Sequence, residues 1–370
     1  MLESHYLEIL LVCGIIITFI GGYLCLSTVP QKETFKDYRR SRIIIGFTIM
    51  VWGFEYILLS KTNFRTQAPF MATAINISMY YAGALLFGAG IISLIKKDYI
   101  NKKQIITDII KYISVLSLIW SGALFFQGKA RNLTLILSAA IFGMDAIRLS
   151  VIFFKNYNKT LKNLNNYYSE NTANFVKWIN KCVSSIVVMG ILGSILAFAP
   201  KWVISIYAIG GLLVFIFTFN CLQNYLIGYE KINPVFEEDI QVEEQEIINR
   251  DIIKSNPCIF DDMGQILTKW VNEGSFLQGG VTIQQLSVEI GTNRTYLSEY
   301  INKEFGMTFR EWITDLRIEE SKKLLIENKS ATIIEIAEKT GYATSSHFIR
   351  TFTNKEGISP SKWRETINVE

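Results

Sequence analysis

Seven apolar stretches in the N-terminal part of the chain restrict its fold more than any other feature of the sequence. A helix needs about 20 apolar residues to cross the hydrocarbon layer of a bilayer, because each residue adds only ~1.5 Å to its length. The stretches that approach or exceed this length are 9–29, 43–60, 70–95, 112–127, 133–154, 182–200 and 202–228. They predict an all-α fold that begins with a seven-span transmembrane helical bundle.

Charge divides the chain into three parts. Residues 1–229 carry 21 Lys and Arg against 9 Asp and Glu, a net charge of +12, whereas residues 230–262 carry −7 and residues 263–370 carry −1. We therefore expect a transmembrane domain over 1–229, an acidic linker over 230–260 and a soluble helical domain over 261–370. Isoleucines recur at near-helical spacing within the linker. It is either a solvated spacer or a short helix that pairs with a second copy.

Basic residues are distributed unevenly among the loops that connect the apolar stretches. The first, third and fifth loops hold 15 Lys and Arg, and the second, fourth and sixth hold 5. Loops that stay in the cytoplasm are enriched in Lys and Arg. This bias predicts an N-terminus outside a bacterial inner (cytoplasmic) membrane. Because the number of spans is odd, the C-terminal domain is predicted to lie in the cytoplasm.

Three ionisable residues interrupt the apolar stretches, namely Glu55 in the second and Asp145 and Arg148 in the fifth. A charge at membrane depth costs several kcal/mol unless it is paired or hydrated. Asp145 and Arg148 are three residues apart, so they share a helix face and can pair. Two interpretations follow. Either these charges neutralise one another, with Glu55 reaching Arg148 across the bundle, or they form a polar intramembrane site for a ligand, to which polar residues such as Asn76 also contribute.

The residues that usually carry catalysis or bind metals are sparse. Five cysteines show no paired spacing, and the only histidines are His5 and His347. A disulfide framework or a zinc site needs Cys or His at characteristic spacings. The chain also lacks a His-Glu-x-x-His motif and a phosphate-binding loop. The sequence therefore predicts no enzyme, no metal site and no cofactor.

A helix-turn-helix pattern occurs twice in the C-terminal part of the chain, over 282–301 and over 332–352. In each, apolar residues recur at helical spacing on both sides of a glycine, Gly291 or Gly341, which permits a left-handed turn. Thr292 or Asn293 is expected to cap the second helix of the first pattern. The inward positions are Ile283, Leu286, Ile290, Leu297 and Ile301 in the first pattern and Ile333, Ile336, Ala337, Phe348 and Phe352 in the second.

Short polar side chains and arginine occupy the outward positions of the second helix in each pattern. Such side chains meet base edges when a helix lies in the major groove of DNA. A helix over 308–328 separates the patterns and would be ~30 Å long, close to the ~34 Å of one DNA turn. The candidate DNA-contacting residues are Asn293, Arg294, Thr295, Ser298 and Glu299 in the first pattern and Thr344, Ser345, Ser346, Ile349 and Arg350 in the second.

Basic side chains in the same domain are candidates to bind DNA phosphates. They are Lys303, Arg310, Arg317, Lys322, Lys355, Lys362 and Arg364. The alternative is a plain helical bundle with ordinary solvent-facing side chains. The net charge of −1 favours this alternative, because DNA-binding domains usually carry a basic surface.

Residues 282–364 resemble the DNA-binding domain of AraC/XylS-type transcription regulators. The resemblance lies in Leu297-Ser298, residues 306–325, Ile336-Ala337 with Gly341-Tyr342, residues 347–352 and residues 357–364. It implies a seven-helix domain with two helix-turn-helix units that bind double-stranded DNA. It also implies base-contacting positions at Thr295, Ser298 and Glu299, and at Ser345, Ser346, Ile349 and Arg350. The sequence departs from the family at Ser287 and Ser321, where alanine is usual, and at Glu299, where a basic residue is common.

Together these features predict a membrane-bound, sequence-specific transcription regulator. Its spans would sense an unidentified small-molecule or membrane signal, and a homodimer in the bilayer is an expected partner arrangement. Two alternatives remain open at this point. The chain is a transporter-like membrane protein with a regulatory DNA-binding tail, or its spans serve only as an anchor.

Overall fold

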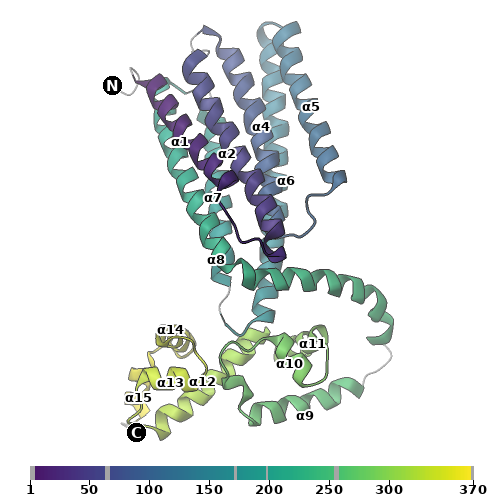
Figure 1. Ribbon diagram of the computed structural model, residues 1–370, viewed down its shortest axis with the longest axis vertical. Helices are drawn as coiled ribbons and strands as arrows, with labels where there is room; N and C mark the ends of the chain where they lie inside the picture. The colour runs from purple at the N-terminus through teal and green to yellow at the C-terminus, as the bar shows by residue number, and fades with distance from the viewer. Residues whose placement is uncertain (1–4, 63–66, 171–172, 197–198, 254–257, 368–370) are drawn as a thin grey trace. The chain divides into compact units, whose positions relative to one another are not determined.

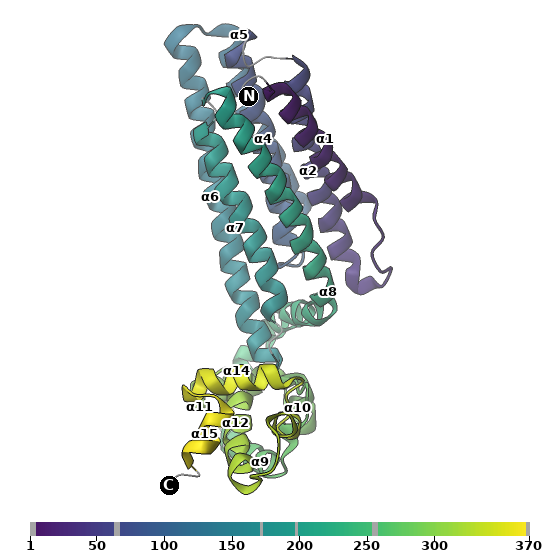
Figure 2. The same ribbon diagram turned by 90° about the vertical axis from the view of Figure 1, so that its left-hand side faces the viewer.

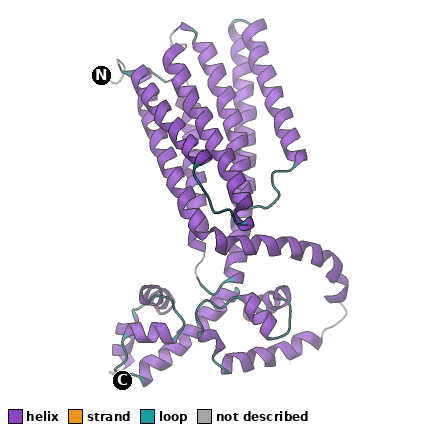
Figure 3. Cartoon of the chain, viewed as in Figure 1, coloured by secondary structure: helices purple, strands orange, loops and turns teal. Residues whose placement is uncertain are grey.

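The structure is a computed structural model that describes residues 5–62, 67–170, 173–196, 199–253 and 258–367. Within these ranges it does not describe the side chains of residues 173, 194–195, 234–253 and 258–262. Over the described backbone the regular elements are helices (Figure 3). The one strand-like pairing among the described residues is an isolated antiparallel bridge between Tyr168 and Thr282. The predicted all-α fold is confirmed.

The chain forms two compact units. The first contains Met1–Thr160 and Asn174–Phe236, and the second contains Leu161–Ala173 and Glu237–Glu370. The second unit therefore includes, besides the C-terminal residues, part of the segment that the sequence places between the fifth and sixth apolar stretches. The acidic linker expected over 230–260 is helical as far as Ile253. The isoleucines that would decide whether it pairs lie outside the described side chains.

Among the described residues, seven helices are long and apolar enough to cross a membrane, judged by length and composition. They are α1 (Tyr6–Leu26), α2 (Lys36–Thr62) with the short η1 (Glu33–Phe35) before it, α4 (Pro69–Ser93), α5 (Lys102–Phe125), α6 (Gly128–Tyr167), α7 (Ala173–Leu196) and α8 (Lys201–Ile253). The apolar part of each helix, which for α8 is Lys201–Asn233, runs alongside the others in both views of the bundle (Figures 1 and 2). The fourth apolar stretch, expected from residue 112, begins earlier in the structure, at Lys102 of α5.

Glycines bring the backbones of α1 and α2 close together. A Cβ on Gly14 would lie 2.8 Å from the carbonyl oxygen of Gly53, and a Cβ on Gly53 would lie 2.8 Å from the carbonyl oxygen of Gly14. Real Cβ atoms are not found at such distances, so only glycine fits at both positions. Small residues of this kind allow helices to pack tightly in the absence of a strong hydrophobic driving force.

Seven α-helices follow in the described part of the second unit, the number that the family resemblance implies. They are α9 (Cys258–Asn272), α10 (Ile283–Glu289), α11 (Arg294–Phe305), α12 (Phe309–Glu327), α13 (Ile333–Lys339), α14 (Ser345–Glu356) and α15 (Pro360–Ile367), with η2 (Ser275–Leu277) after α9. Threonine begins three of them. Thr282, Thr308 and Thr332 each form a capping box with the Gln or Glu three residues later, which satisfies backbone N–H groups at the helix start.

The inward positions of both helix-turn-helix patterns form the core of this unit. Leu286, Leu297, Ile336, Phe348 and Phe352 have no exposed surface. Apolar residues of α12, α13 and α14 make one continuous cluster, against which Trp363 of α15 packs. The predicted inner faces are confirmed, except that two isoleucines at their edges are only half-buried, namely Ile290 and Ile333.

Candidate nucleic-acid interface

Side-chain caps fix the start of the second helix in each helix-turn-helix unit. Asn293 accepts a hydrogen bond from the backbone N–H of Tyr296 at 2.8 Å, so α11 begins at Arg294. Thr344 accepts one from the backbone N–H of His347 at 3.2 Å, so α14 begins at Ser345. The glycines before them have φ of +72° at Gly291 and +77° at Gly341, a conformation that glycine adopts without strain.

The two recognition helices, α11 and α14, differ in how open their outward faces are. On α14 and its cap, Thr344, Ser346, Ile349 and Arg350 are exposed and Ser345 is half-buried. On α11 and its cap, only Asn293 and Glu299 are exposed, whereas Arg294, Thr295 and Ser298 are half-buried. The second helix-turn-helix unit thus presents the more accessible of the two predicted DNA-contacting surfaces.

The long helix between the two helix-turn-helix units has the predicted length. It is α12, which spans 19 residues between the caps Thr308 and Asn328 and is therefore ~28 Å long. Trp312 on α12 stacks on Trp270 of α9 and on Phe305 of α11, with ring centres 5.9 Å and 5.8 Å apart. These contacts hold the first helix-turn-helix unit against α12.

Arg317 does not serve as a phosphate ligand, contrary to the expectation from the sequence. Its side chain is 3% exposed. Nε donates to the carbonyl oxygen of Phe276 at 2.9 Å, and Nη2 donates to that of Gln278 at 2.7 Å. Burial lowers the pKa of Arg317. The residue instead ties α12 to the segment between α9 and α10 through two charge-assisted hydrogen bonds.

Several of the other predicted phosphate ligands are already engaged within the domain. Lys322 pairs with Glu319 and Glu356, each at 2.9 Å, and Lys355 pairs with Asp315 at 2.6 Å. Arg364 donates to the carbonyl oxygen of Lys329 at 3.4 Å. Lys303 and Lys362 are exposed. Acidic neighbours within the domain therefore partly neutralise Lys322 and Lys355.

A basic group of side chains gathers beside the start of α14. Burial, then the charges of Arg350 and Arg310, lowers the pKa of His347. Burial and the charge of Arg350 also lower the pKa of Arg310. Neighbouring positive charges of this kind favour the approach of an anion such as a phosphate. Arg310 and Arg350 thus place positive charge at this part of the surface, and the charge of Glu170 partly offsets it.

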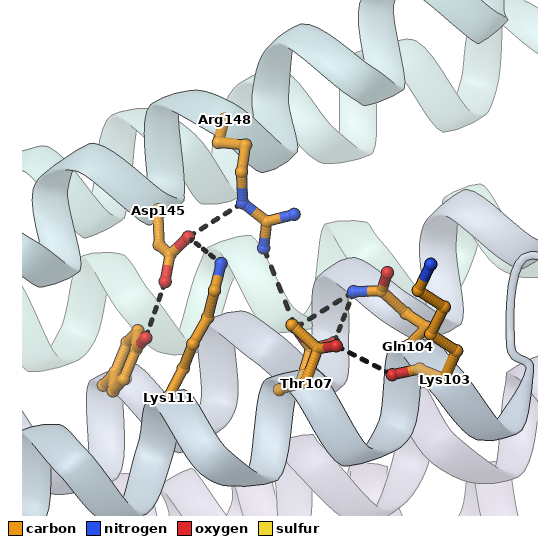
Figure 4. A network of polar contacts seen from close by, with 8 residues as sticks. Lys103, Gln104, Thr107, Lys111, Asp145 and Arg148 are labelled. Carbon is orange, nitrogen blue, oxygen red and sulfur yellow. Dashed lines mark hydrogen bonds and ion pairs between the residues drawn. The ribbon is translucent and has the colours of Figure 1, made fainter.

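In the first compact unit of the chain, which contains the seven long apolar helices, Asp145 and Arg148 belong to one polar network (Figure 4). The Asp145 carboxylate accepts hydrogen bonds from Arg148 at 2.8 Å, from Lys111 at 2.9 Å and from the Tyr81 hydroxyl at 2.6 Å. Arg148 also lies 3.7 Å from Asp108. Two carboxylates and two cations thus balance one another, as the neutralising interpretation of the sequence expected. Lys111, counted as a loop residue from the sequence, lies within α5.

Glu55 does not join this network. It is 1% exposed on α2, and its partner is Asn76 of α4, whose amide nitrogen donates to Glu55 Oε1 at 3.0 Å when it faces its acceptors. The expected contact between Glu55 and Arg148 was wrong, because α2 turns Glu55 towards α4. Of the three residues proposed as one intramembrane site, the structure brings together only the two on α6.

Sequence reasoning missed the contribution of residues 161–170 to the second unit. Asn165 accepts a hydrogen bond from Arg310, and Tyr167 lies against Arg294. The signal available in the sequence was weak, consisting of a cluster of asparagines and tyrosines within the fifth loop.

Comparison with known proteins agrees with the geometry of α10 to α15. Residues 286–366 match the family model described as a helix-turn-helix domain, HTH_18. The class of protein module at the C-terminus is therefore a DNA-binding helix-turn-helix domain. Within that class it is a domain of the AraC/XylS type, as the sequence resemblance implied.

The chain is similar to curated regulators over this part only. It is 35% identical to the uncharacterised HTH-type transcriptional regulator YtdP of Bacillus subtilis over 85 residues, which are 23% of this chain and 11% of that protein. It is 32% identical to the uncharacterised HTH-type transcriptional regulator YobQ of the same organism over 87 residues, 24% of this chain and 36% of that protein.

A solved structure is also similar to this region. It is the C-terminal domain of AraT, a response regulator from Geobacillus stearothermophilus, which is 31% identical and covers 26% of this chain and 79% of that chain, with a TM-score of 0.25.

Proposed function

We propose that this chain is a membrane-embedded, sequence-specific regulator of transcription whose helices α11 and α14 enter the major groove of DNA. The observation that carries the proposal is the open face of α14 in a helix-turn-helix domain of the AraC/XylS type. There the exposed Arg350 can donate two hydrogen bonds to a guanine, and Ile349 can touch a thymine methyl group. The curated relatives named above are transcription regulators by their descriptions, which agrees with this role.

The first unit is proposed to lie in the inner membrane of a bacterium, with the DNA-binding domain in the cytoplasm. The apolar length of seven helices supports this location. So do large apolar side chains on the outside of the bundle, such as Phe19, Leu124 and Ile227, which are 76%, 75% and 75% exposed. Water-facing surfaces seldom carry many such residues. The bias of Lys and Arg towards three of the loops supports the orientation.

The spans are further proposed to receive the signal. A cavity of about 600 Å³ lies among α2, α4, α6, α7 and α8. Its lining is largely apolar and aromatic, including Trp52, Tyr80, Phe142 and Tyr207. A cavity of this size and lining suits a small, mainly apolar molecule. A signal acts only if it prefers one state of the protein over another.

The DNA-binding proposal is tested with Arg350→Ala in the full-length chain reconstituted in lipid nanodiscs. The probe is a duplex that contains the genomic site most occupied by the wild-type protein. Loss of a bidentate contact to guanine should weaken binding about five- to 150-fold, because such a contact is worth ~1–3 kcal/mol. Lys269→Ala is the matched control, since Lys269 is 79% exposed on α9 and loses the same charge. Equal affinity of both variants would exclude the groove assignment of α14.

A reporter gene controlled by the same genomic site distinguishes spans that sense a signal from spans that only anchor the protein. Asp145→Asn leaves Lys111 and Arg148 without their shared carboxylate, and Glu55→Gln removes a second buried acid. If the spans sense, these variants should change induction at unchanged protein level. Unchanged induction would favour the anchor. A transporter with a regulatory tail is the less favoured alternative, because the seven spans show no inverted repeat in the sequence.

A further inference from the structure

The end of α6 and the residues that follow it are part of the DNA-binding unit. We call residues 161–170 the strap. Leu164 of the strap has no exposed surface, and Tyr167 is 9% exposed. Beyond Tyr167 the strap pairs with the start of the first helix-turn-helix unit. Tyr168 forms an antiparallel bridge with Thr282, and the backbone N–H of Ser169 donates to the carbonyl oxygen of Val281 at 3.1 Å.

The strap contacts the first recognition helix at a predicted DNA-contacting residue. The guanidinium carbon of Arg294 lies 5.5 Å from the centre of the Tyr167 ring, within the range of a cation–π interaction. Arg294 is the first residue of α11, where a helix N-terminus and a basic side chain would meet a DNA phosphate. Arg294 is half-buried, whereas Arg350 of the second recognition helix is exposed.

Two further strap residues face basic groups of the domain. Arg310 Nη1 donates to Asn165 Oδ1 at 3.2 Å. Glu170 is close enough that its charge acts on both Arg317 and His347, and its carboxylate oxygen lies 4.0 Å from where a Cβ on Gly280 would be. An amide and an aromatic ring of the strap thus meet two arginines, Arg310 and Arg294, that are candidates to contact DNA.

We propose that the strap is an intramolecular partner that competes with DNA for the first helix-turn-helix unit and the start of α12, so that DNA binding requires the strap to leave Arg294 and Arg310. The inference deepens the proposed function and rests on it. The strap begins in the last turns of α6 and ends before α7, and both helices are candidate membrane spans. A movement of these two helices relative to each other would pull directly on the strap, and a signal in the spans would reach DNA affinity by this route.

Weakening the strap should therefore strengthen DNA binding. The test uses the double variant Asn165→Ala and Tyr167→Leu in full-length protein in nanodiscs, with the same duplex probe. Leucine keeps the apolar bulk of Tyr167 but removes the ring that Arg294 contacts. Loss of one hydrogen bond and one cation–π contact should tighten binding about five- to thirty-fold. Asn158→Ala on the exposed side of α6 is the control and should leave affinity unchanged. Weaker binding by the double variant would mean that the strap supports the DNA-competent fold, and would overturn the proposal.

A second variant keeps the test decisive if the double variant unfolds. Tyr168→Cys and Thr282→Cys together place two thiols at bridged positions, where the Cα separation of an antiparallel pair suits a disulfide. The oxidised protein, with the strap locked, should bind the duplex at least tenfold more weakly than the reduced protein. The variants that carry Tyr168→Cys alone or Thr282→Cys alone should bind DNA with an affinity that the reductant does not change. Equal affinity of the locked and reduced forms would overturn the strap proposal, whereas no binding by wild-type protein in any state would count against the proposed function itself.

Discussion

Replacing Gly341 with alanine tests whether the turn of the second helix-turn-helix unit is fixed by its backbone and its surroundings together. Gly341 has φ of +77°, and a left-handed conformation costs a residue with a Cβ about 1–2 kcal/mol. Its Cβ would also collide with the carbonyl oxygen of Leu277 and lie 3.1 Å from Cζ of Arg317. The shifts of neighbouring atoms needed to accommodate this Cβ cost a further ~1–3 kcal/mol. Gly341→Ala should therefore destabilise the domain by roughly 2–5 kcal/mol.

Gly306→Ala is the matched control for this prediction. Gly306 has φ of +66°, but a Cβ there would meet no atom within 4 Å. Its cost is the conformational one alone, about 1–2 kcal/mol. Hydrogen exchange of α13 and α14 amides in the detergent-solubilised chain measures both values, since each loss of about 1.4 kcal/mol in opening free energy raises the exchange rate tenfold. Equal effects of the two substitutions would refute the close contact between Gly341 and Leu277.

Two further predictions concern basic groups that are buried or half-buried. Arg317→Met removes the donor to the carbonyl oxygens of Phe276 and Gln278, so it should lower the opening free energy measured by hydrogen exchange by about 3 kcal/mol or more. Lys323→Met, on the exposed face of α12, should change that free energy by no more than about 0.5 kcal/mol, and similar values for both variants would contradict the buried role of Arg317. The pKa of His347 is lowered from 6.5 in the folded domain, chiefly by burial, so below pH 6.5 the unfolded state takes up more protons and stability falls as the pH falls. His347→Gln should remove that part of the loss between pH 6.5 and pH 5, and an identical slope in both proteins would show that His347 does not contribute.

The helix-turn-helix units were predictable because their signals are local. The spacing of Leu286, Leu297, Phe348 and Phe352, and the glycine in each turn, specify helices and inner faces within a short stretch of sequence. The later start of α14 relative to its glycine was also predictable, because the cap residues Asn293 and Thr344 mark it.

The roles of individual polar residues were harder to predict because they depend on contacts across the fold. Arg317 looks like any surface arginine in the sequence, and only the carbonyl groups of Phe276 and Gln278 make it a buried residue. The partner of Glu55 depends on how α2 and α4 are rotated about their axes. The strap contacts residues that are far away in the sequence, as the hydrogen bond between Arg310 and Asn165 shows. The spacing of apolar residues along the sequence does not predict such a contact.

We propose that one chain is held in a membrane and on specific DNA at the same time. The most direct measurement crosslinks living cells, floats the membranes on a density gradient and sequences the DNA that rises with the epitope-tagged chain. We predict a small set of discrete promoter fragments in the membrane fraction, lost with Arg350→Ala and retained with Lys269→Ala. Recovery of the chain in the soluble fraction, or membranes that carry no enriched DNA, would show that the protein does not bind DNA from the membrane.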